Sequence, residues 1–167
     1  MLNNLKEIIA DKWEVTGTSK NKLIEKQASR IITEVNISTA GQYLLYKFEE
    51  NGHIQMPYLK SNKNVKKISD YVLFTIDKGV LYVLIFELKN GNGHPLKQLE
   101  ATEILTKYLI ETANRVSKIS FNNVKYRRIG ITNRSIKMNL RPSKIYDKNN
   151  YARIANRSKL DIKVLCE

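Results

Sequence analysis

The chain has 167 residues, of which 42% are hydrophobic, and carries 29 Lys and Arg against 16 Asp and Glu, a formal net charge of +13. We expect a single domain over 1–167, and the lone cysteine, Cys166, excludes an intrachain disulfide or a cysteine-based zinc site. No apolar run approaches the roughly 20 residues of a membrane span and no signal peptide is evident, so we expect a cytoplasmic protein without a membrane partner. The positive charge favours a polyanion, with nucleic acid the commonest intracellular one; a membrane surface or an acidic protein would also fit.

The first third of the chain shows both helical and strand patterns. Apolar residues at helical spacing predict a helix from Leu2 to about Trp13. The next segment is ambiguous, and we expect a short helix to about Ser29 followed by a strand, Arg30 to Ile37. A turn signal at residues 39–41 makes Gln42 to Phe48 the expected hairpin partner of that strand.

The stretch from Asp70 to Lys89 reads as two strands folded back through Asp77-Lys78-Gly79. If Lys78 and Gly79 are the loop residues, Asp70 faces Glu87 across the pair. The rest of both strands is apolar on both faces, which predicts central, covered strands.

Two opposed carboxylates at the end of such strands repel each other unless a cation lies between them. Lys89 points to the same face as Glu87. Buried charge is unfavourable when it is merely structural, and a divalent cation held by carboxylate oxygens compensates for it, so the pair predicts a metal site. The alternative is an ordinary solvated strand end, and a one-residue slip in register would separate the two carboxylates.

Basic residues flank this stretch. Lys60 to Lys67 is a polar basic loop that leads to Asp70, and it is either simply solvated or in contact with phosphate. After a tight loop at residues 90–93, Pro95 is expected to open a helix whose apolar stripe runs to about Val116, with its N-terminus close to the site. The stripe consists of Ala101, Ile104, Leu105, Tyr108 and Leu109. Gln98 near the helix start either bonds to backbone or points at the metal site.

The C-terminal part begins with a clear strand, Val124 to Thr132, which carries Arg127 and Arg128. From about residue 133 the chain becomes strongly basic, as a C-terminal extension in which cations alternate with tyrosines. Such a mixture suits backbone contacts and base stacking on nucleic acid, whereas the alternative is a partly disordered tail closed by a short strand, Leu160 to Leu165. The expected nucleic-acid contacts are Lys63, Lys66, Lys67, Arg127, Arg128 and Arg134.

The order of a strand with Asp70, a strand with Glu87-Leu88-Lys89 and a helix with Gln98 resembles the PD-(D/E)XK nuclease superfamily, the restriction-endonuclease-like fold. The match covers roughly Ile68 to Thr132. Ser69 stands where the motif that names the superfamily has proline. The resemblance implies an α/β (α+β) fold in which a central mixed β-sheet is flanked by helices.

The resemblance also implies a function. It suggests a DNA endonuclease in which Mg²⁺, or Mn²⁺, is held by Asp70, Glu87 and the carbonyl of Leu88. Lys89 would activate water or stabilise phosphate charge, and Gln98 would orient the lysine or the water. A further acidic ligand often comes from the first helix in this superfamily; Glu25 and Glu34 are candidates and Glu7 a weaker one.

Several alternatives remain open at this point. The chain could be a catalytically inactive nucleic-acid-binding or targeting subunit on the same fold, or a nuclease that cleaves RNA. A homodimer or a partner protein would fit a nuclease of this size. A role in defence against foreign DNA rests on analogy alone.

Overall fold

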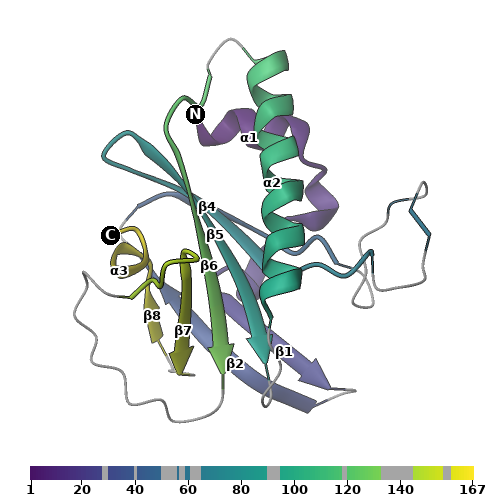
Figure 1. Ribbon diagram of the computed structural model, residues 1–167, viewed down its shortest axis with the longest axis vertical. Coiled ribbons are helices and arrows are strands. Elements are labelled where there is room, and N and C mark those ends of the chain that lie inside the picture. Colours follow the sequence, from purple (N-terminus) through teal and green to yellow (C-terminus); the bar gives the residue numbers. More distant parts are fainter. Residues whose placement is uncertain are drawn as a thin grey trace.

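The computed structural model describes residues 1–27, 30–39, 41–49, 56, 59–60, 65–89, 95–117, 120–132, 145–155 and 159–167. Within these ranges two β-sheets are formed (Figure 1). The larger sheet has five strands in the order β3-β4-β5-β6-β7. Their bounds are β3, Tyr43–Tyr46; β4, Tyr71–Asp77; β5, Val80–Lys89; β6, Val124–Thr132; and β7, Tyr151–Ala155.

The larger sheet is mixed, as expected. The β3–β4 and β4–β5 pairs are antiparallel, whereas the β5–β6 and β6–β7 pairs are parallel. The smaller sheet has the order β1-β2-β8, with β1 at Lys22–Gln27, β2 at Arg30–Ser38 and β8 at Lys159–Asp161. β1 and β2 are antiparallel, and β8 adds in parallel to β2.

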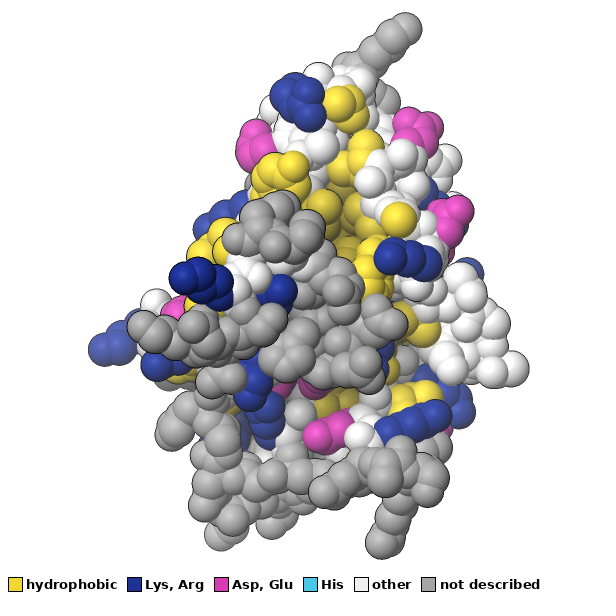
Figure 2. Space-filling model, turned by 90° about the vertical axis from the view of Figure 1, so that its right-hand side faces the viewer, with side chains coloured by type: hydrophobic (Ala, Val, Ile, Leu, Met, Phe, Trp, Pro, Cys, Tyr) yellow, Lys and Arg dark blue, Asp and Glu magenta, His cyan; other side chains and the backbone are white. Residues whose placement is uncertain are grey.

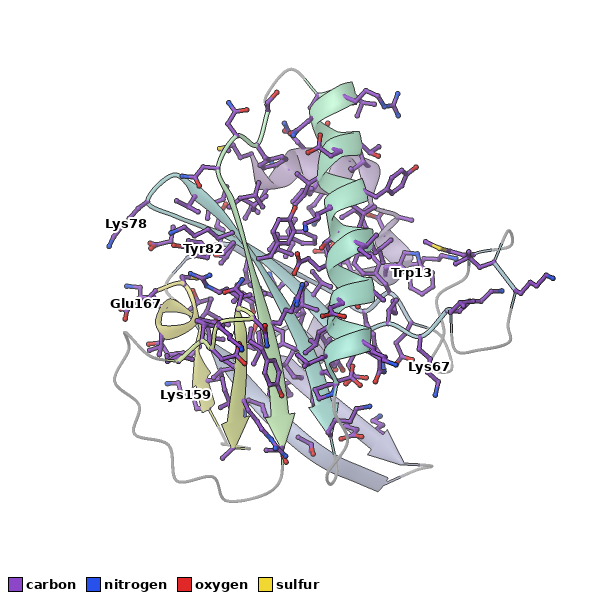
Figure 3. All side chains as sticks on the ribbon, viewed as in Figure 1. Trp13, Lys67, Lys78, Tyr82, Lys159 and Glu167 are labelled. Carbon is purple, nitrogen blue, oxygen red and sulfur yellow. The ribbon has the colours of Figure 1, made fainter. Side chains whose placement is uncertain are left out.

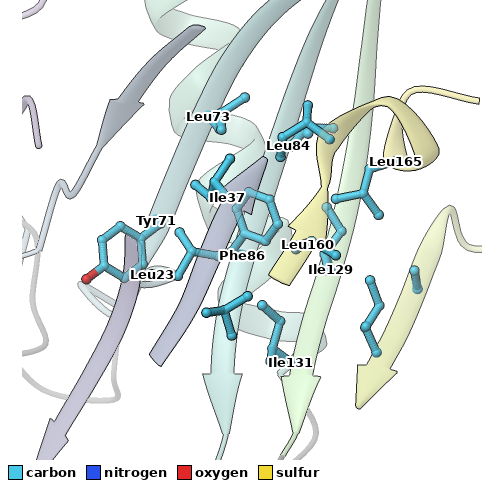
Figure 4. Packing of buried hydrophobic residues seen from close by; sticks show 14 of the residues in the cluster. Leu23, Ile37, Tyr71, Leu73, Leu84, Phe86, Ile129, Ile131, Leu160 and Leu165 are labelled. Atoms are coloured by element: carbon cyan, nitrogen blue, oxygen red, sulfur yellow. The ribbon is translucent and has the colours of Figure 1, made fainter. Parts of the chain in front are cut away.

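The helices are α1 at Leu2–Ile8, α2 at Leu96–Val116 and α3 at Ile162–Leu165, with short 3₁₀ turns at Asp11–Trp13 and Gly17–Ser19. Helices α1 and α2 cover one face of the larger sheet, and the smaller sheet and α3 cover the other. One apolar core joins α1 and α2 to β4 and β5 through residues such as Leu5, Val83 and Leu99. The second core lies between the two sheets and includes α3, and Figure 4 shows Leu23 and Ile37 of the smaller sheet packed near Phe86. The expected α/β class, with a central mixed sheet flanked by helices, is confirmed, and the smaller sheet is an additional layer.

The β4–β5 hairpin has the predicted register. Asp77 pairs with Val80 and Tyr71 with Phe86, so Lys78 and Gly79 are the two loop residues. Both have positive φ, 48° and 77°, as a two-residue turn that matches strand twist requires. Both strands lie inside the sheet, and eight of the ten β5 residues are buried. The strands are therefore central and covered, as predicted.

α2 is present where it was expected, but its buried face differs from the predicted stripe. Its buried residues are Leu99, Thr102, Glu103, Thr106, Ile110 and Ala113. Ile104 and Tyr108, placed in the core by the apolar pattern, are 69% and 67% exposed. The buried threonines fit because their hydroxyls bond to main-chain carbonyls of their own helix, at Gln98 and Glu103.

The exposed apolar residues of α2 lie at a hollow of about 440 Å³, whose other walls include Leu59 and Val65. Figure 2 shows hydrophobic side chains gathered on this side of the molecule, with Lys and Arg on both sides of them. No helix within the described residues is long and apolar enough to cross a bilayer.

The N-terminal expectations were only partly correct. The first helix ends at Ile8, and Asp11–Trp13 forms a separate 3₁₀ turn. The predicted helix to Ser29 is wrong, because Lys22–Gln27 is strand β1, paired with β2. The segment Gln42 to Phe48 does contain a strand, β3, but this strand pairs with β4 in the other sheet rather than with β2.

The C-terminal part adds strands to both sheets. Val124–Thr132 is β6, as predicted, and β7 extends the larger sheet beyond it. The expected strand from Leu160 to Leu165 is instead the short strand β8 followed by α3. Asp161 caps this helix by accepting a hydrogen bond from the Lys163 amide. The tight loop at residues 90–93 and the start of the basic extension at 133–144 lie outside the described residues.

Candidate active site

The two predicted carboxylates meet at one end of the β4–β5 hairpin. The pairing of Tyr71 with Phe86 is the last of the ladder, and Asp70 precedes β4 by one residue. The Asp70 Oδ2 atom accepts a hydrogen bond of 2.6 Å from the Leu88 amide, which ties Asp70 to β5. In a strand the amide and carbonyl of one residue point to the same edge, so the Leu88 carbonyl faces Asp70 too.

Glu87 is a buried carboxylate that its surroundings satisfy only in part. Its side chain is 1% exposed. Oε1 lies 2.5 Å from the Nζ atom of Lys89, whose side chain is one-third exposed, and Oε2 is buried with no hydrogen-bond partner. Buried polar atoms in folded proteins almost always have a partner, so the Oε2 atom makes Glu87 a candidate ligand for a cation.

Burial and neighbouring charges raise the pKa values of both carboxylates. Burial raises the pKa of Asp70 to about 6; the Leu88 amide and Lys89 lower it, and Glu49 and Glu25 raise it. Burial and the charge of Asp70 raise the pKa of Glu87 to about 7, against the opposing effects of Lys89 and the Asp70 main chain. The charge of Asp70 therefore makes Glu87 harder to ionise.

The structure distinguishes between the two candidates for a third acid. Glu25 has a buried Oε2 without a hydrogen-bond partner, and its pKa is raised by burial and lowered by Lys89. Glu34 alternates to the other face of the smaller sheet, where it binds Lys22 at 2.7 Å. Glu25 thus belongs to the site, although it comes from strand β1 and not from a helix. Glu7, the weaker candidate, is exposed on α1.

One tyrosine holds Glu25 near the site. The Tyr71 hydroxyl donates to the Ile24 carbonyl at 2.9 Å and accepts from the Ile24 amide at 3.2 Å. These two bonds tie the outer edge of β1 to the start of β4. They fix the backbone next to Glu25 relative to Asp70.

Sequence reasoning missed two residues of the site, Lys47 and Glu49. They follow β3, and their side chains form an ion pair of 2.9 Å. The charge of Glu49 raises the pKa of Asp70, and the Lys47 Nζ atom lies 5.6 Å from the ring centroid of Tyr71. Only the pairing of β3 with β4 brings them here, and no local pattern in the sequence indicates that pairing.

Gln98 supports the site from outside it. Its Nε2 atom donates to the Ile68 carbonyl at 3.3 Å, so it takes the backbone-bonded role rather than pointing at Lys89. One turn further along α2, Thr102 Oγ1 accepts from the Ser69 amide at 2.7 Å. The first turns of α2 therefore hold the two residues before Asp70.

The donor set of the site fits a hard divalent ion that uses few protein ligands. Among the described residues, no three His, Cys, Asp or Glu side chains form a ready-made metal cage. Mg²⁺ is commonly bound by one or two carboxylates, with water and substrate phosphate supplying the rest. Asp70, Glu87 with its unpaired Oε2, and the Leu88 carbonyl match that requirement.

The residues expected to contact nucleic acid have different surroundings. Lys67 is exposed and Lys66 is half-buried, and both directly precede the Ile68–Asp70 segment. Arg128 is bound to Glu103 at 2.8 Å and to Glu100 at 3.4 Å. Arg127 bonds to Asn150 and lies over the Tyr146 ring, 4.7 Å from its centroid. Contacts of these residues with nucleic acid stay a prediction, and Lys63 and Arg134 lie outside the described residues.

Comparisons with known proteins add no assignment: no family model, curated protein or solved structure matches this chain.

Proposed function

We propose that the chain is a metal-dependent nuclease that hydrolyses phosphodiester bonds of DNA at Asp70, Glu87 and Lys89. The observation that carries this proposal is the buried Glu87, with one oxygen on Lys89 and the other unpaired beside Asp70. Four carboxylates, those of Glu25, Glu49, Asp70 and Glu87, share this region with the two ammonium groups of Lys47 and Lys89. A formal excess of negative charge at this site in a protein of net charge +13 favours a bound cation.

Asp70, Glu87 and the Leu88 carbonyl would hold Mg²⁺ or Mn²⁺. Such an ion, when bound, polarises the phosphate and activates water for attack. Glu25 is close enough to influence the charge of Asp70 and would orient water around the site. The resemblance of the sequence to PD-(D/E)XK nucleases supports the same assignment.

Lys89 has a separate role in the proposal. Its ammonium is fixed by Glu87 at 2.5 Å while one-third of the side chain stays exposed. A cation held in this way can face the phosphate and stabilise the negative charge that develops on it without having to reorganise. The exposed Lys67, close before Asp70, would hold a flanking phosphate.

The test is cleavage of plasmid, single-stranded DNA and matched RNA by purified protein, with Mg²⁺, Mn²⁺ or chelator. We expect metal-dependent cleavage of DNA, reduced at least about 100-fold in Asp70→Asn and Glu87→Gln. Glu34→Gln, which changes an ion-paired carboxylate outside the site, is the matched control and should cleave normally. Circular dichroism checks that each variant is folded.

Unchanged activity in both site variants would refute the assignment. Salt-sensitive DNA binding without cleavage under any metal would instead support a non-catalytic binding subunit. Cleavage of RNA alone would transfer the proposal to an RNA nuclease. A role in defence against foreign DNA stays a prediction.

A further inference from the structure

A pocket lies next to the candidate site, and the residues before β1 that form one of its walls have no part in the mechanism above. Its volume is about 440 Å³, within the range of ~300–1,000 Å³ typical of small-molecule sites. It is lined by Lys12, Trp13, Glu14, Val15, Lys47 and Glu49. Two of these residues connect it to the site, since the charges of Lys47 and Glu49 both interact with Asp70.

The pocket walls are held by main-chain bonds. Residues 13–15 run beside the end of β3, where Lys47 donates its amide to the Trp13 carbonyl at 2.9 Å and Val15 donates to Leu45 at 2.8 Å. The Trp13 ring is half-buried and packs in part against the core that joins α1 and α2 to the larger sheet. Figure 3 shows Trp13 on the same side of the molecule as Lys67. Trp13 and Lys47 are therefore fixed relative to each other.

The chemical groups in the pocket match those that bind a nucleotide. The exposed Lys12 lies with its Nζ atom 4.6 Å from the Trp13 ring centroid. Both carboxylates of the pocket are already neutralised, Glu14 by Lys6 at 3.1 Å and Glu49 by Lys47 at 2.9 Å. An indole face can stack a base, ammonium groups can bind phosphate, and carboxylates can accept hydrogen bonds from base amino groups.

We propose that this pocket binds one unpaired nucleotide of the substrate strand, next to the phosphodiester that is cleaved. The base replaces Lys12 on the Trp13 ring, and Lys12 and Lys47 bind its phosphates. A base inside a duplex is stacked and paired, so this arrangement selects single-stranded or locally unpaired nucleic acid. The inference rests on the proposed function for the identity of the neighbouring site.

Trp13 is the only tryptophan of the chain, so its fluorescence reports directly on the pocket. The probe is a short single-stranded DNA titrated in the presence of chelator, which prevents metal-dependent cleavage. We expect saturable quenching with single-stranded DNA and none with the same sequence as a duplex. Lys47→Met should weaken the binding about tenfold, the loss of one charge-assisted contact. Lys163→Met, which removes an exposed lysine on α3, is the matched control and should bind normally.

A second pair of variants separates stacking from folding. Binding measured by fluorescence anisotropy of labelled DNA should be retained in Trp13→Phe, which keeps an aromatic face, and should fall about tenfold in Trp13→Leu. Two results would overturn the proposal that the pocket binds a nucleotide: metal-dependent cleavage without quenching of Trp13 fluorescence, or normal DNA binding by Trp13→Leu. Either result would leave the nuclease proposal intact. Quenching with the expected variant pattern but no cleavage under any metal would support the pocket and refute the nuclease.

Discussion

At the scale of single residues, Glu87 is the side chain that packing alone explains least. A carboxylate that is 1% exposed and has one unpaired oxygen destabilises the fold unless another group compensates its charge. Burial and Asp70 raise its pKa to about 7 from an ordinary value of 4.5, while Lys89 opposes them. The folded protein therefore binds a proton at Glu87 more tightly than the unfolded chain does, and this contribution to stability is lost as the pH rises from about 4.5 through 7.

The raised pKa of Glu87 predicts how the stability of Glu87→Gln changes with pH when no metal is present. The variant should be more stable than the original chain at pH 8, by about 1 to 3 kcal/mol, and the difference should shrink at pH 5. Urea denaturation in chelator at both pH values measures it. The neighbouring charged residues Glu25, Asp70 and Lys89 are present in both proteins. Glu7→Gln, on the exposed side of α1, should show no such pH-dependent gain, and equal pH profiles for Glu87→Gln and the original chain would contradict the account.

At the scale of elements, two hydrogen bonds of Tyr71 tie strand β1 to the start of β4, next to the site. Replacing Tyr71 with Phe removes two hydrogen bonds and leaves the Ile24 amide and carbonyl without that partner. We expect a loss of about 1–2 kcal/mol in the free energy of unfolding, measured by urea denaturation. Tyr108→Phe, at a position 67% exposed, is the matched control and should change stability little. If the free energy of unfolding of Tyr71→Phe equals that of the original chain, other contacts hold β1 in place.

The elements also show what the sequence could and could not predict. The register of β4 with β5 was predictable because Lys78-Gly79 suits a two-residue turn, and such a turn fixes which residues pair on the two strands. β1 was mistaken for a helix because its apolar spacing suits both structures, and its pairing with β2 decides between them. The buried face of α2 was misplaced because apolar residues were counted and the two threonines that bond within the helix were not.

The candidate site also contains some residues that the sequence could predict and others that it could not. Asp70, Glu87 and Lys89 lie on one hairpin, so local pairing brings them together. Glu25 arrives from the other sheet, and Glu49 from the end of β3, through contacts between segments far apart in the sequence. Such long-range contacts have no local signature, which is why Glu25 could not be chosen over Glu34 and why Lys47 and Glu49 were missed.

At the scale of the whole molecule, charge is distributed unevenly. The net charge of +13 attracts a polyanion, whereas the site itself gathers carboxylates. A phosphate would be repelled by Asp70 and Glu87 unless a cation lay between them. We propose that a divalent metal held by Asp70 and Glu87 removes this repulsion, and that Lys89 serves cleavage without being needed to hold the metal.

Calorimetric titration of Mg²⁺ and Mn²⁺ into the original chain, Glu87→Gln and Lys89→Ala, with cleavage rates measured on the same samples, tests this claim most directly. We predict saturable binding by the original chain, loss of binding in Glu87→Gln, and binding retained in Lys89→Ala at pH 8 while its cleavage rate falls about 100-fold or more. Absence of metal binding in the original chain, binding unchanged in Glu87→Gln, or full activity in Lys89→Ala would contradict it.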